Sequence, residues 1–173
     1  METKIIMDKV TIDRIGLLHP RLRSEAMDIY EEICDALKGR AMCRFTHTLR
    51  TFSEQDELFS KGRTAPGSIV TKAKGGFSMH NYGMAIDIVL IVDTDGDGDY
   101  DRAVWDTKMD FDNDRKADWQ EVVQVFKEFG WTWGGDWKFT DNPHFEKSFG
   151  YSVRELLNIK KKRKVDQDGY VSV

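Results

Sequence analysis

The chain has 173 residues and a formal net charge of −4, and 40% of its residues are hydrophobic and 12% aromatic. This composition is sufficient for one compact domain with its own core, and the length argues against two domains. No stretch approaches the roughly 20 apolar residues of a membrane-spanning helix, which excludes membrane insertion. We therefore expect a single domain over residues 1–173.

The N-terminus and the cysteines bear on where the protein is made. Residues 1–10 alternate charged residues with Ile and Met, and they lack the continuous apolar segment of a signal peptide. Cys34 and Cys43 form no CxxC pair, so a disulfide framework is not indicated. We expect synthesis in the cytoplasm without a signal peptide, a monomeric protein, and no nucleic-acid partner.

An amphipathic helix is predicted after His19-Pro20, because apolar residues recur at helical spacing from Leu22 to Leu37. His19 is expected at the helix entry rather than on a metal. Residues 43–50 alternate as in a strand, which places Arg50 at its end. The planar guanidinium there either forms a surface ion pair or holds a substrate carboxylate.

A short helix over residues 54–60 is predicted next, with Ser53 as its cap. Residues 61–77 are rich in Gly and small residues and show no helical periodicity, which predicts a long loop. Loops of this length in a compact domain are often functional.

Residues 78–87, Ser-Met-His-Asn-Tyr-Gly-Met-Ala-Ile-Asp, contain the first candidate metal ligands. His80 and Asp87 would lie about 23 Å apart along a strand and about 10 Å apart along a helix, so the chain has to fold back for both to reach one ion. Gly83 permits such a turn. Asp87 is the one polar residue in the apolar run 85–92, which predicts a buried strand, and a carboxylate there is costly unless it is paired or bound to metal.

An acidic insert follows this strand. Residues 93–118 contain ten Asp and four Lys or Arg, a local charge of −6 against +2 for the remainder. The pattern partly matches a calcium-binding loop with Gly98 in its sixth position, but Val104 stands where such loops have Glu. A calcium site and a solvated acidic turn both remain open. The candidate calcium ligands are Asp93, Asp95, Asp97, Asp99 and Asp101. The cluster is extended by Asp106, Asp110, Asp112 and Asp114.

The C-terminal part begins with a second predicted core helix over residues 116–129. Trp131, Trp133 and Trp137 then either complete the core or line a ligand cleft. The segment 141–144, Asp-Asn-Pro-His, supplies a further carboxylate and a further imidazole.

Near the end of the chain, Ser152 and Glu155 form a capping box that predicts a helix through Ile159. A basic run over residues 160–164 follows, which we interpret as a basic tail. Such a run is usually a solvated helix end, although it can also add affinity for an anionic polymer.

Several motifs occur together and in order over residues 18–151. They are Leu49-Arg50-Thr51 followed by Gln55, Gly62-Arg63-Thr64, Ser78-x-His80-Asn81-x-Gly83-x-Ala85-x-Asp87, Trp133-Gly134-Gly135-Asp136-Trp137, and Asp141-x-Pro143-His144-Phe145. In combination they resemble the zinc peptidases that cut peptidoglycan stem peptides, the VanY-like D-alanyl-D-alanine carboxypeptidases. The resemblance is greater to the L-alanyl-D-glutamate endopeptidases that bacteriophages use as endolysins.

The resemblance implies roles for six residues. His80, Asp87 and His144 would bind one zinc ion, Asp141 would be the catalytic carboxylate, and Arg50 and Ser78 would bind substrate. Many members have Glu where this chain has Asp141, and the acidic insert lies outside the family's core pattern. The implied enzyme hydrolyses the L-alanyl-D-glutamate bond of stem peptides, and a phage enzyme without a signal peptide would reach the wall after release through a holin.

Two alternatives compete with this interpretation. A D,D-carboxypeptidase would release terminal D-Ala from the same polymer. A non-catalytic wall-binding or calcium-binding module would hold zinc only as a structural ion, which requires a fourth protein ligand. The expected fold is α+β, with a small antiparallel sheet that carries the zinc site and is flanked by helices near residues 20–38 and 116–129.

Overall fold

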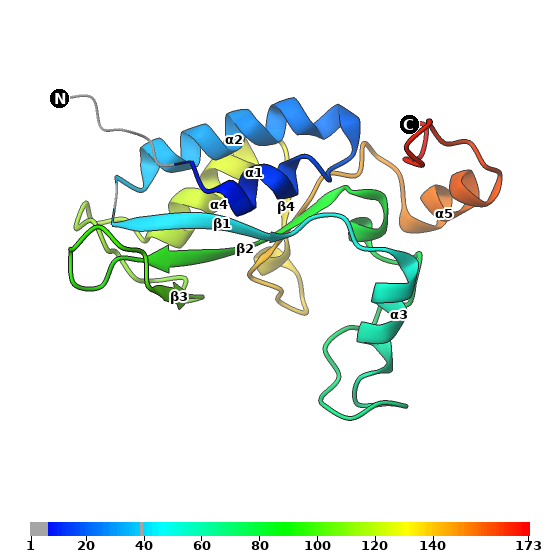
Figure 1. The fold of residues 1–173 in the computed structure, drawn as a ribbon, viewed down its shortest axis with the longest axis horizontal. Coiled ribbons are helices and arrows are strands. Elements are labelled where there is room, and N and C mark those ends of the chain that lie inside the picture. The colour runs from blue at the N-terminus through cyan, green and yellow to red at the C-terminus, as the bar shows by residue number, and fades with distance from the viewer. Residues whose placement is uncertain (1–6, 39) are drawn as a thin grey trace.

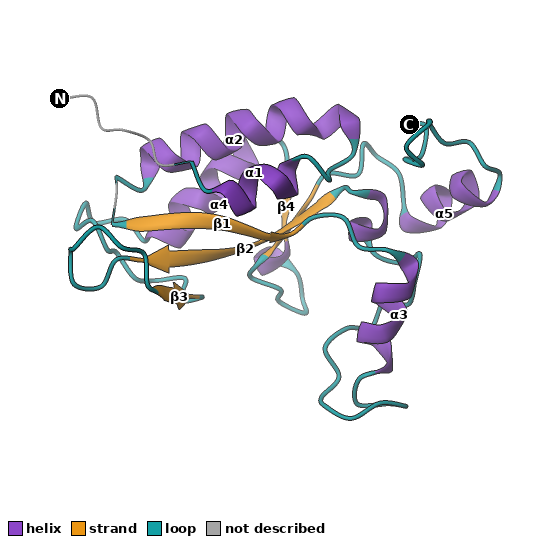
Figure 2. Cartoon of the chain, in the orientation of Figure 1, coloured by secondary structure: helices purple, strands orange, loops and turns teal. Residues whose placement is uncertain are grey.

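A computed structural model describes residues 7–38 and 40–173 of the chain. Its helices are α1 (Lys9–Ile15), α2 (Arg23–Ala36), α3 (Phe52–Ser60), α4 (Asp118–Glu128) and α5 (Val153–Lys161), with 3-10 helices η1 (Pro20–Leu22), η2 (Met79–Tyr82) and η3 (Gly134–Asp136). The strands are β1 (Ala41–His47), β2 (Ala85–Val92), β3 (Arg102–Val104), β4 (Thr132–Trp133) and β5 (His144–Glu146). Helices and a small sheet therefore form one α+β architecture, as predicted (Figures 1 and 2).

Strand β2 is the centre of an antiparallel sheet. Strand β1 pairs with one edge of β2 from Ala41↔Val92 to His47↔Asp87. On the other edge, β5 pairs with the start of β2 and β3 pairs with its end, while β4 extends the sheet beyond β5. Because β5 lies against the first residues of β2, His144 stands directly opposite Asp87.

One face of the sheet is covered by helices: α1 and α2 lie above β1 and β2 in Figure 1, and α4, drawn behind β1, packs against α2 and β4. Side chains alternate between the faces of a strand, and Ile86, Ile88 and Leu90 of β2 are fully buried in the core on the helical side. Phe126 of α4 stacks on Phe145 of β5, with ring centroids 4.0 Å apart. Asp87 therefore projects from the face opposite the helices.

Most long elements agree with their prediction. The buried strand has the predicted bounds. The helix predicted near residues 20–38 corresponds to η1 followed by α2, and the helix predicted near residues 116–129 corresponds to α4. Ser152 and Glu155 form the predicted capping box at the start of α5. His19 also has its predicted structural role: its Nδ1 accepts from Arg21 N at the entry of η1, and its Nε2 lies 2.9 Å from Val171 O.

Other details differ from the prediction. Ser53 does not cap α3, because Thr51 does: its hydroxyl accepts from Glu54 N while the Glu54 carboxylate accepts from Thr51 N. The predicted strand over residues 43–50 ends at His47, where the pairing register shifts. Helix α1, capped by Asp8, was not predicted.

Within the part of the chain that the structure describes, no helix combines the length and the apolar character that a membrane crossing requires. The prediction about residues 1–10 falls partly on residues 1–6, which lie outside the described part.

The turn that joins η2 to β2 depends on Gly83. This residue has φ +67°, a left-handed conformation that costs other residues about 1–2 kcal/mol. Its carbonyl also accepts from His19 N at 2.8 Å, and a Cβ added at Gly83 would lie 2.7 Å from that same backbone nitrogen. The fold-back between His80 and Asp87 is therefore fixed by both conformation and close contact.

We predict that Gly83→Ala lowers the free energy of unfolding by more than Gly130→Ala. Gly130 has a similar φ of +79°, but a Cβ there meets nothing within 4 Å. The control therefore carries only the conformational cost of about 1–2 kcal/mol, whereas Gly83→Ala also displaces the His19 backbone. Urea unfolding of both variants measures the difference, and equal losses would contradict this account of the turn.

Candidate metal centre and active site

The three predicted metal ligands come together on the exposed face of the sheet. His80 comes from η2, Asp87 from β2 and His144 from β5, and one donor atom of each lies within 4.8 Å of the others. Asp87 Oδ1 is 3.1 Å from His80 Nε2 and 3.1 Å from His144 Nδ1. The carboxylate therefore stands between two imidazoles whose rings are 5.0 Å apart.

His80 is oriented by the backbone of the chain segment that follows β1. Its Nδ1 lies 2.8 Å from the Thr48 carbonyl oxygen, and because a carbonyl only accepts, Nδ1 carries the proton. The lone pair is then on Nε2, which is buried and has no hydrogen-bond partner. Nε2 and Asp87 Oδ1 face each other as two acceptors at 3.1 Å, and a cation between them would stabilise this arrangement.

His144 is oriented by a second carboxylate. Its Nε2 lies 2.9 Å from Glu146 Oε2, and its Nδ1 faces Asp87. Burial alone would lower the pKa of His144, but its hydrogen bonds with Asp87 and Glu146 outweigh burial and raise it to about 9. Without metal the imidazole is therefore a cation shared by two carboxylates, and metal binding at Nδ1 would release a proton.

Asp87 is held in its ionised form. Burial would raise its pKa, but the hydrogen bond and the positive charge of His144 act against burial, and the pKa lies below the usual range. Arg50 adds a further positive charge, with Nη2 3.6 Å from Asp87 Oδ2. The Asp87 side chain is partly buried, with 22% of its surface exposed, and its charge is stabilised by the cationic groups around it.

This donor set fits a zinc ion. Two imidazole nitrogens and one carboxylate oxygen are ligands that zinc accepts, and three protein ligands leave one tetrahedral position open. The unpartnered Nε2 of His80 is the atom that a metal would satisfy. Among the residues described, the group contains these three donors and no cysteine, which matches an open rather than a closed site.

A cleft of about 660 Å³ opens above this group, and it is lined by all six residues to which the family resemblance gives a role, but by none of the candidate calcium ligands. Arg50 and Ser78 stand on its wall together with Asp141. The Ser78 hydroxyl also accepts from His80 N at 3.3 Å, so it caps η2 in addition to facing the cleft. The sequence motifs, which are far apart along the chain, are therefore neighbours in space.

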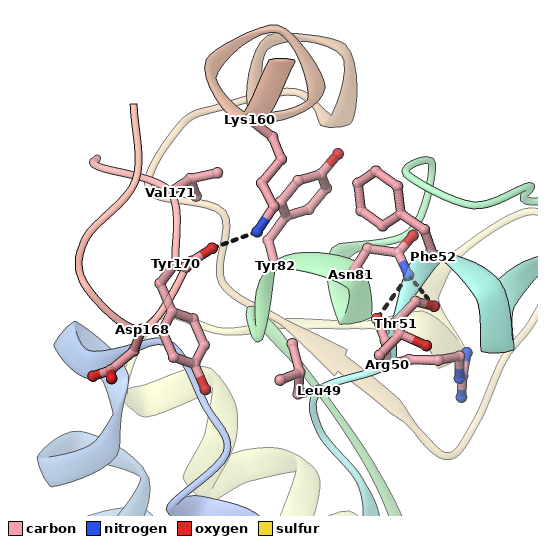
Figure 3. Close-up of a pocket in the computed structure, with 11 residues that line it drawn as sticks. Leu49, Arg50, Thr51, Phe52, Asn81, Tyr82, Lys160, Asp168, Tyr170 and Val171 are labelled. Atoms are coloured by element: carbon pink, nitrogen blue, oxygen red, sulfur yellow. Dashed lines mark hydrogen bonds between the residues drawn. The ribbon is translucent and has the colours of Figure 1, made fainter. Parts of the chain in front are cut away.

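The backbone of Arg50 is fixed from behind the cleft. Asn81 Nδ2 donates to the Arg50 carbonyl at 3.0 Å, and Arg50 N donates to His80 O at 2.9 Å. Figure 3 shows Asn81 reaching the backbone of Arg50 and Thr51. The Arg50 guanidinium donates to Gln55 Oε1 through Nη1 at 3.0 Å. Its other N–H groups can donate to a ligand in the cleft.

Asp141 has the environment of a proton-transfer group. Desolvation raises its pKa, the charge of His144 opposes this rise, and the charge of Asp87 adds to it. Its backbone is fixed because Asp141 N donates to Gly134 O at 3.0 Å and its carbonyl accepts from His144 N at 3.2 Å. A carboxyl group with a raised pKa beside a metal centre is suited to general acid and base chemistry.

The aromatic residues divide between core and cleft. Trp131 is buried and donates to Glu25, and Trp133 donates to the Asn142 carbonyl. Trp137 lines the cleft, with its ring centroid 5.2 Å from that of His144. Trp105 also lines the cleft with 55% of its surface exposed, so both roles considered for the tryptophans occur.

The acidic loop after β2 is held by its own backbone. Asp93, Asp95 and Asp97 bring oxygens within 4.8 Å of one another, without Asp99 or Asp101. Both oxygens of Asp93 accept backbone N–H groups, from Gly96 and Gly98. Asp101 accepts from the Thr94 hydroxyl. These contacts explain the loop without an ion, and calcium binding there stays a prediction.

Sequence reasoning missed the groups that orient the imidazoles. The Thr48 carbonyl is a backbone acceptor and has no signature in the sequence. Glu146 could have been found, because it stands two residues after His144 and alternate residues of a strand share a face.

We predict that Glu146→Ala weakens zinc binding by about 10–100-fold, the usual effect of losing a group that orients a ligand. Glu146→Gln should retain most of the affinity, because its amide oxygen can still accept from His144 Nε2. The exposed Glu57 supplies a control through Glu57→Ala. Competition with a chelator measures all three variants, and equal affinities for Glu146→Ala and Glu57→Ala would contradict the orienting role.

Comparisons with known proteins agree with this geometry. The sequence model of the D-alanyl-D-alanine carboxypeptidase family matches residues 71–147, a range that contains all three candidate ligands. The peptidoglycan L-alanyl-D-glutamate endopeptidase CwlK of Bacillus subtilis (strain 168) is 45% identical over 129 residues, which cover 71% of this chain and 74% of CwlK. A solved structure, the L-Ala D-Glu endopeptidase ChiX of Serratia marcescens, shares the fold with a TM-score of 0.50 and 22% identity, over 86% of this chain and 94% of ChiX. From the identity to CwlK and the family match, we conclude that the chain belongs to the D-alanyl-D-alanine carboxypeptidase family of peptidases.

Proposed function

We propose that the protein is a zinc peptidase that hydrolyses the L-alanyl-D-glutamate bond of peptidoglycan stem peptides. The observation that carries the proposal is the group His80, Asp87 and His144, which has an unpartnered imidazole nitrogen at the base of an open cleft. The similarity to CwlK supports this bond as the substrate, because CwlK is named for that activity and the shared identity is 45%.

In this proposal His80 Nε2, Asp87 and His144 Nδ1 hold the zinc ion. Zinc in such a site supplies a Lewis acid that polarises the scissile carbonyl and lowers the pKa of water toward neutrality. Thr48 and Glu146 keep the two imidazoles in the tautomers that present a lone pair to the ion. Each imidazole of the group therefore has a partner that fixes its orientation.

Asp141 acts as the general base and then as the general acid. It takes a proton from the attacking water and returns it to the amine of the leaving residue, a role typically worth about 10²–10⁴-fold in rate. Its raised pKa favours this role, because the carboxylate is a stronger base than that of an ordinary aspartate. Its position on the cleft wall supports contact with a bound substrate.

Arg50 and Ser78 bind the substrate. The stem peptide carries the carboxylate of D-Glu, and a guanidinium that already donates to Gln55 can still offer further N–H groups to that anion. Trp105 and Trp137 form apolar parts of the cleft wall. The predicted roles in a phage, release through a holin and a monomeric state extend this proposal and are predictions only.

A D,D-carboxypeptidase is the second candidate, and the description of the matching family favours it. Both activities use the same metal chemistry and differ in which bond lies above the ion. The third interpretation, a binding module with a structural zinc ion, is less well supported, because the candidate ligand group has three members among the described residues and structural sites have four.

We predict that Asp141→Asn retains zinc and loses at least about 10²-fold in turnover, because it removes only the proton-transfer group. His80→Ala should lose zinc and activity together. Asp136→Asn, a nearby exposed position, is the matched control. Metal analysis and turbidity loss of purified cell walls measure these effects, and a fully active Asp141→Asn variant would show that the assigned role is wrong.

The bond that is cleaved is tested by mass spectrometry of digested muropeptides. The proposal predicts stem peptides freed from L-Ala, with a new N-terminal D-Glu. Free D-Ala as the sole product would show that the protein is a D,D-carboxypeptidase and not an endopeptidase. Wall binding without any cleavage would support the binding module.

A further inference from the structure

A second acidic segment, residues 110–121, leads into α4 and is separate from the zinc centre. Its carboxylates occupy the first, third, fifth, ninth and twelfth positions of a twelve-residue stretch: Asp110, Asp112, Asp114, Asp118 and Glu121. These are the side-chain positions from which a helix-linked calcium loop takes its ligands, together with the carbonyl of the seventh residue. Oxygens of Asp110, Asp112 and Asp114 lie within 4.8 Å of one another.

The backbone of this segment folds as such a loop requires. The sixth position of a calcium loop makes a sharp turn that usually needs Gly, and Arg115 occupies it here with φ +78°. The Asp110 carboxylate closes the loop, because it accepts from Asn113 N at 2.7 Å and from Arg115 N at 2.9 Å. Helix α4 then starts at Asp118, so the ninth and twelfth residues stand on its first turn.

A second observation, independent of the residue spacing, also points to a ligand: several buried carboxylate oxygens in this segment have no hydrogen-bond partner. Asp118 is fully buried and Glu121 is 8% exposed, and Asp118 Oδ1 and Glu121 Oε2 have no hydrogen-bond partner. Asp112 Oδ2 is a third such oxygen. A buried unpaired carboxylate oxygen is costly, and the carboxylates act on one another electrostatically: Asp110 and Asp112 on Asp118, and Asp112, Asp114 and Asp118 on Glu121. A cation among these groups would stabilise all three oxygens.

The charges in this segment agree with that interpretation. Burial raises the pKa of Asp118 and of Glu121, and neighbouring carboxylates, including Asp112, raise both further. The ion pair that the described residues provide is Lys38 with Asp114 at 3.2 Å, through a lysine side chain that is 59% exposed. Lys38 and the nearby Lys116, whose charge lowers the pKa of Asp114 and of Glu121, do not balance five carboxylates, and a divalent ion among them would offset two further negative charges.

The loop that the sequence favoured for calcium lacks these features. The residue in its twelfth position is Val104, and both oxygens of its buried Asp93 already accept backbone N–H groups. None of the buried oxygens without partners belongs to residues 93–101, among the residues that the structure describes. The two acidic segments therefore differ in the one property that indicates a ligand.

We propose that residues 110–121 form a calcium site, with ligands from Asp110, Asp112, Asp114, the Lys116 carbonyl, Asp118 and Glu121. Oxygen donors alone, in a flexible loop, favour calcium over zinc, and magnesium fits less well because it demands a rigid octahedron and retains its waters. The loop lies at the end of the sheet where β2 ends, left in Figure 1, whereas Asp87 stands near the start of that strand. Bound calcium would tie the segment between β3 and α4 to a core helix, whether or not the proposed peptidase function is correct.

The test is calorimetric titration of calcium chloride into the zinc-loaded full chain. We expect one calcium ion to bind at residues 110–121, and at calcium a hundredfold above Kd a rise in Tm of roughly 5–10 °C. Glu121→Gln keeps the shape of the side chain and removes its charge, so we expect at least a tenfold weaker affinity. Because this change also removes a repelled buried charge, the calcium-free variant should melt no lower than the parent protein.

Asp97→Asn in the other acidic loop is the matched control and should leave calcium affinity unchanged. Asp112→Asn is a second variant for this site and should weaken binding as Glu121→Gln does. The proposal is overturned if the parent protein shows neither heat nor a change in Tm up to about 10 mM calcium, beyond the range of weak extracellular sites. It is also overturned if affinity is lost in Asp97→Asn and retained in both other variants.

Discussion

The pairing of β2 with β5 is the constraint on which the candidate site depends. It sets His144 opposite Asp87, and the turn at Gly83 brings His80 back to the same carboxylate. A partly buried carboxylate is unfavourable alone, and here two imidazoles and Arg50 surround it. The register between β2 and β5 therefore decides which charged groups meet at the floor of the cleft.

The Thr48 carbonyl and Glu146 contact the imidazole nitrogens that face away from Asp87, and they fix the orientation of both rings. The Thr48 carbonyl fixes the proton of His80 on Nδ1, and Glu146 takes the Nε2 proton of His144. The lone pair of His80 Nε2 then points at Asp87, and His144 Nδ1, which would release its proton on metal binding, faces the same carboxylate. The same physical features that explain the shifted pKa of His144 thus support a metal-binding function.

The sequence predicted the elements that carry strong periodic patterns. Strand β2 and helices α2 and α4 bury long apolar faces, so their patterns were sufficient. The short strands β4 and β5 contain too few residues for a pattern, and their pairing depends on contacts with β2. Thr51 rather than Ser53 caps α3 because the chain leaves its extended conformation there, which composition does not indicate.

The candidate site also has features that the sequence predicted and features that it did not. The spacing of His80 and Asp87 required a fold-back but did not specify their partner. Segment 141–144 offered a further carboxylate and a further imidazole, and the resemblance to a known family assigned roles to Asp141 and His144. Counting acidic residues also directed attention to residues 93–101, because the first positions of that loop match a calcium pattern. Burial of Asp118 and Glu121, which becomes apparent only when α4 packs on the core, distinguishes the second segment.

The most direct test of the central claim is a crystal structure of the zinc-loaded protein, with anomalous diffraction recorded on both sides of the zinc absorption edge. The account predicts one strong zinc peak shared by His80 Nε2, Asp87 and His144 Nδ1, with no fourth protein ligand. A zinc peak elsewhere, or one completed by a fourth side chain such as Glu146, would contradict an open catalytic centre.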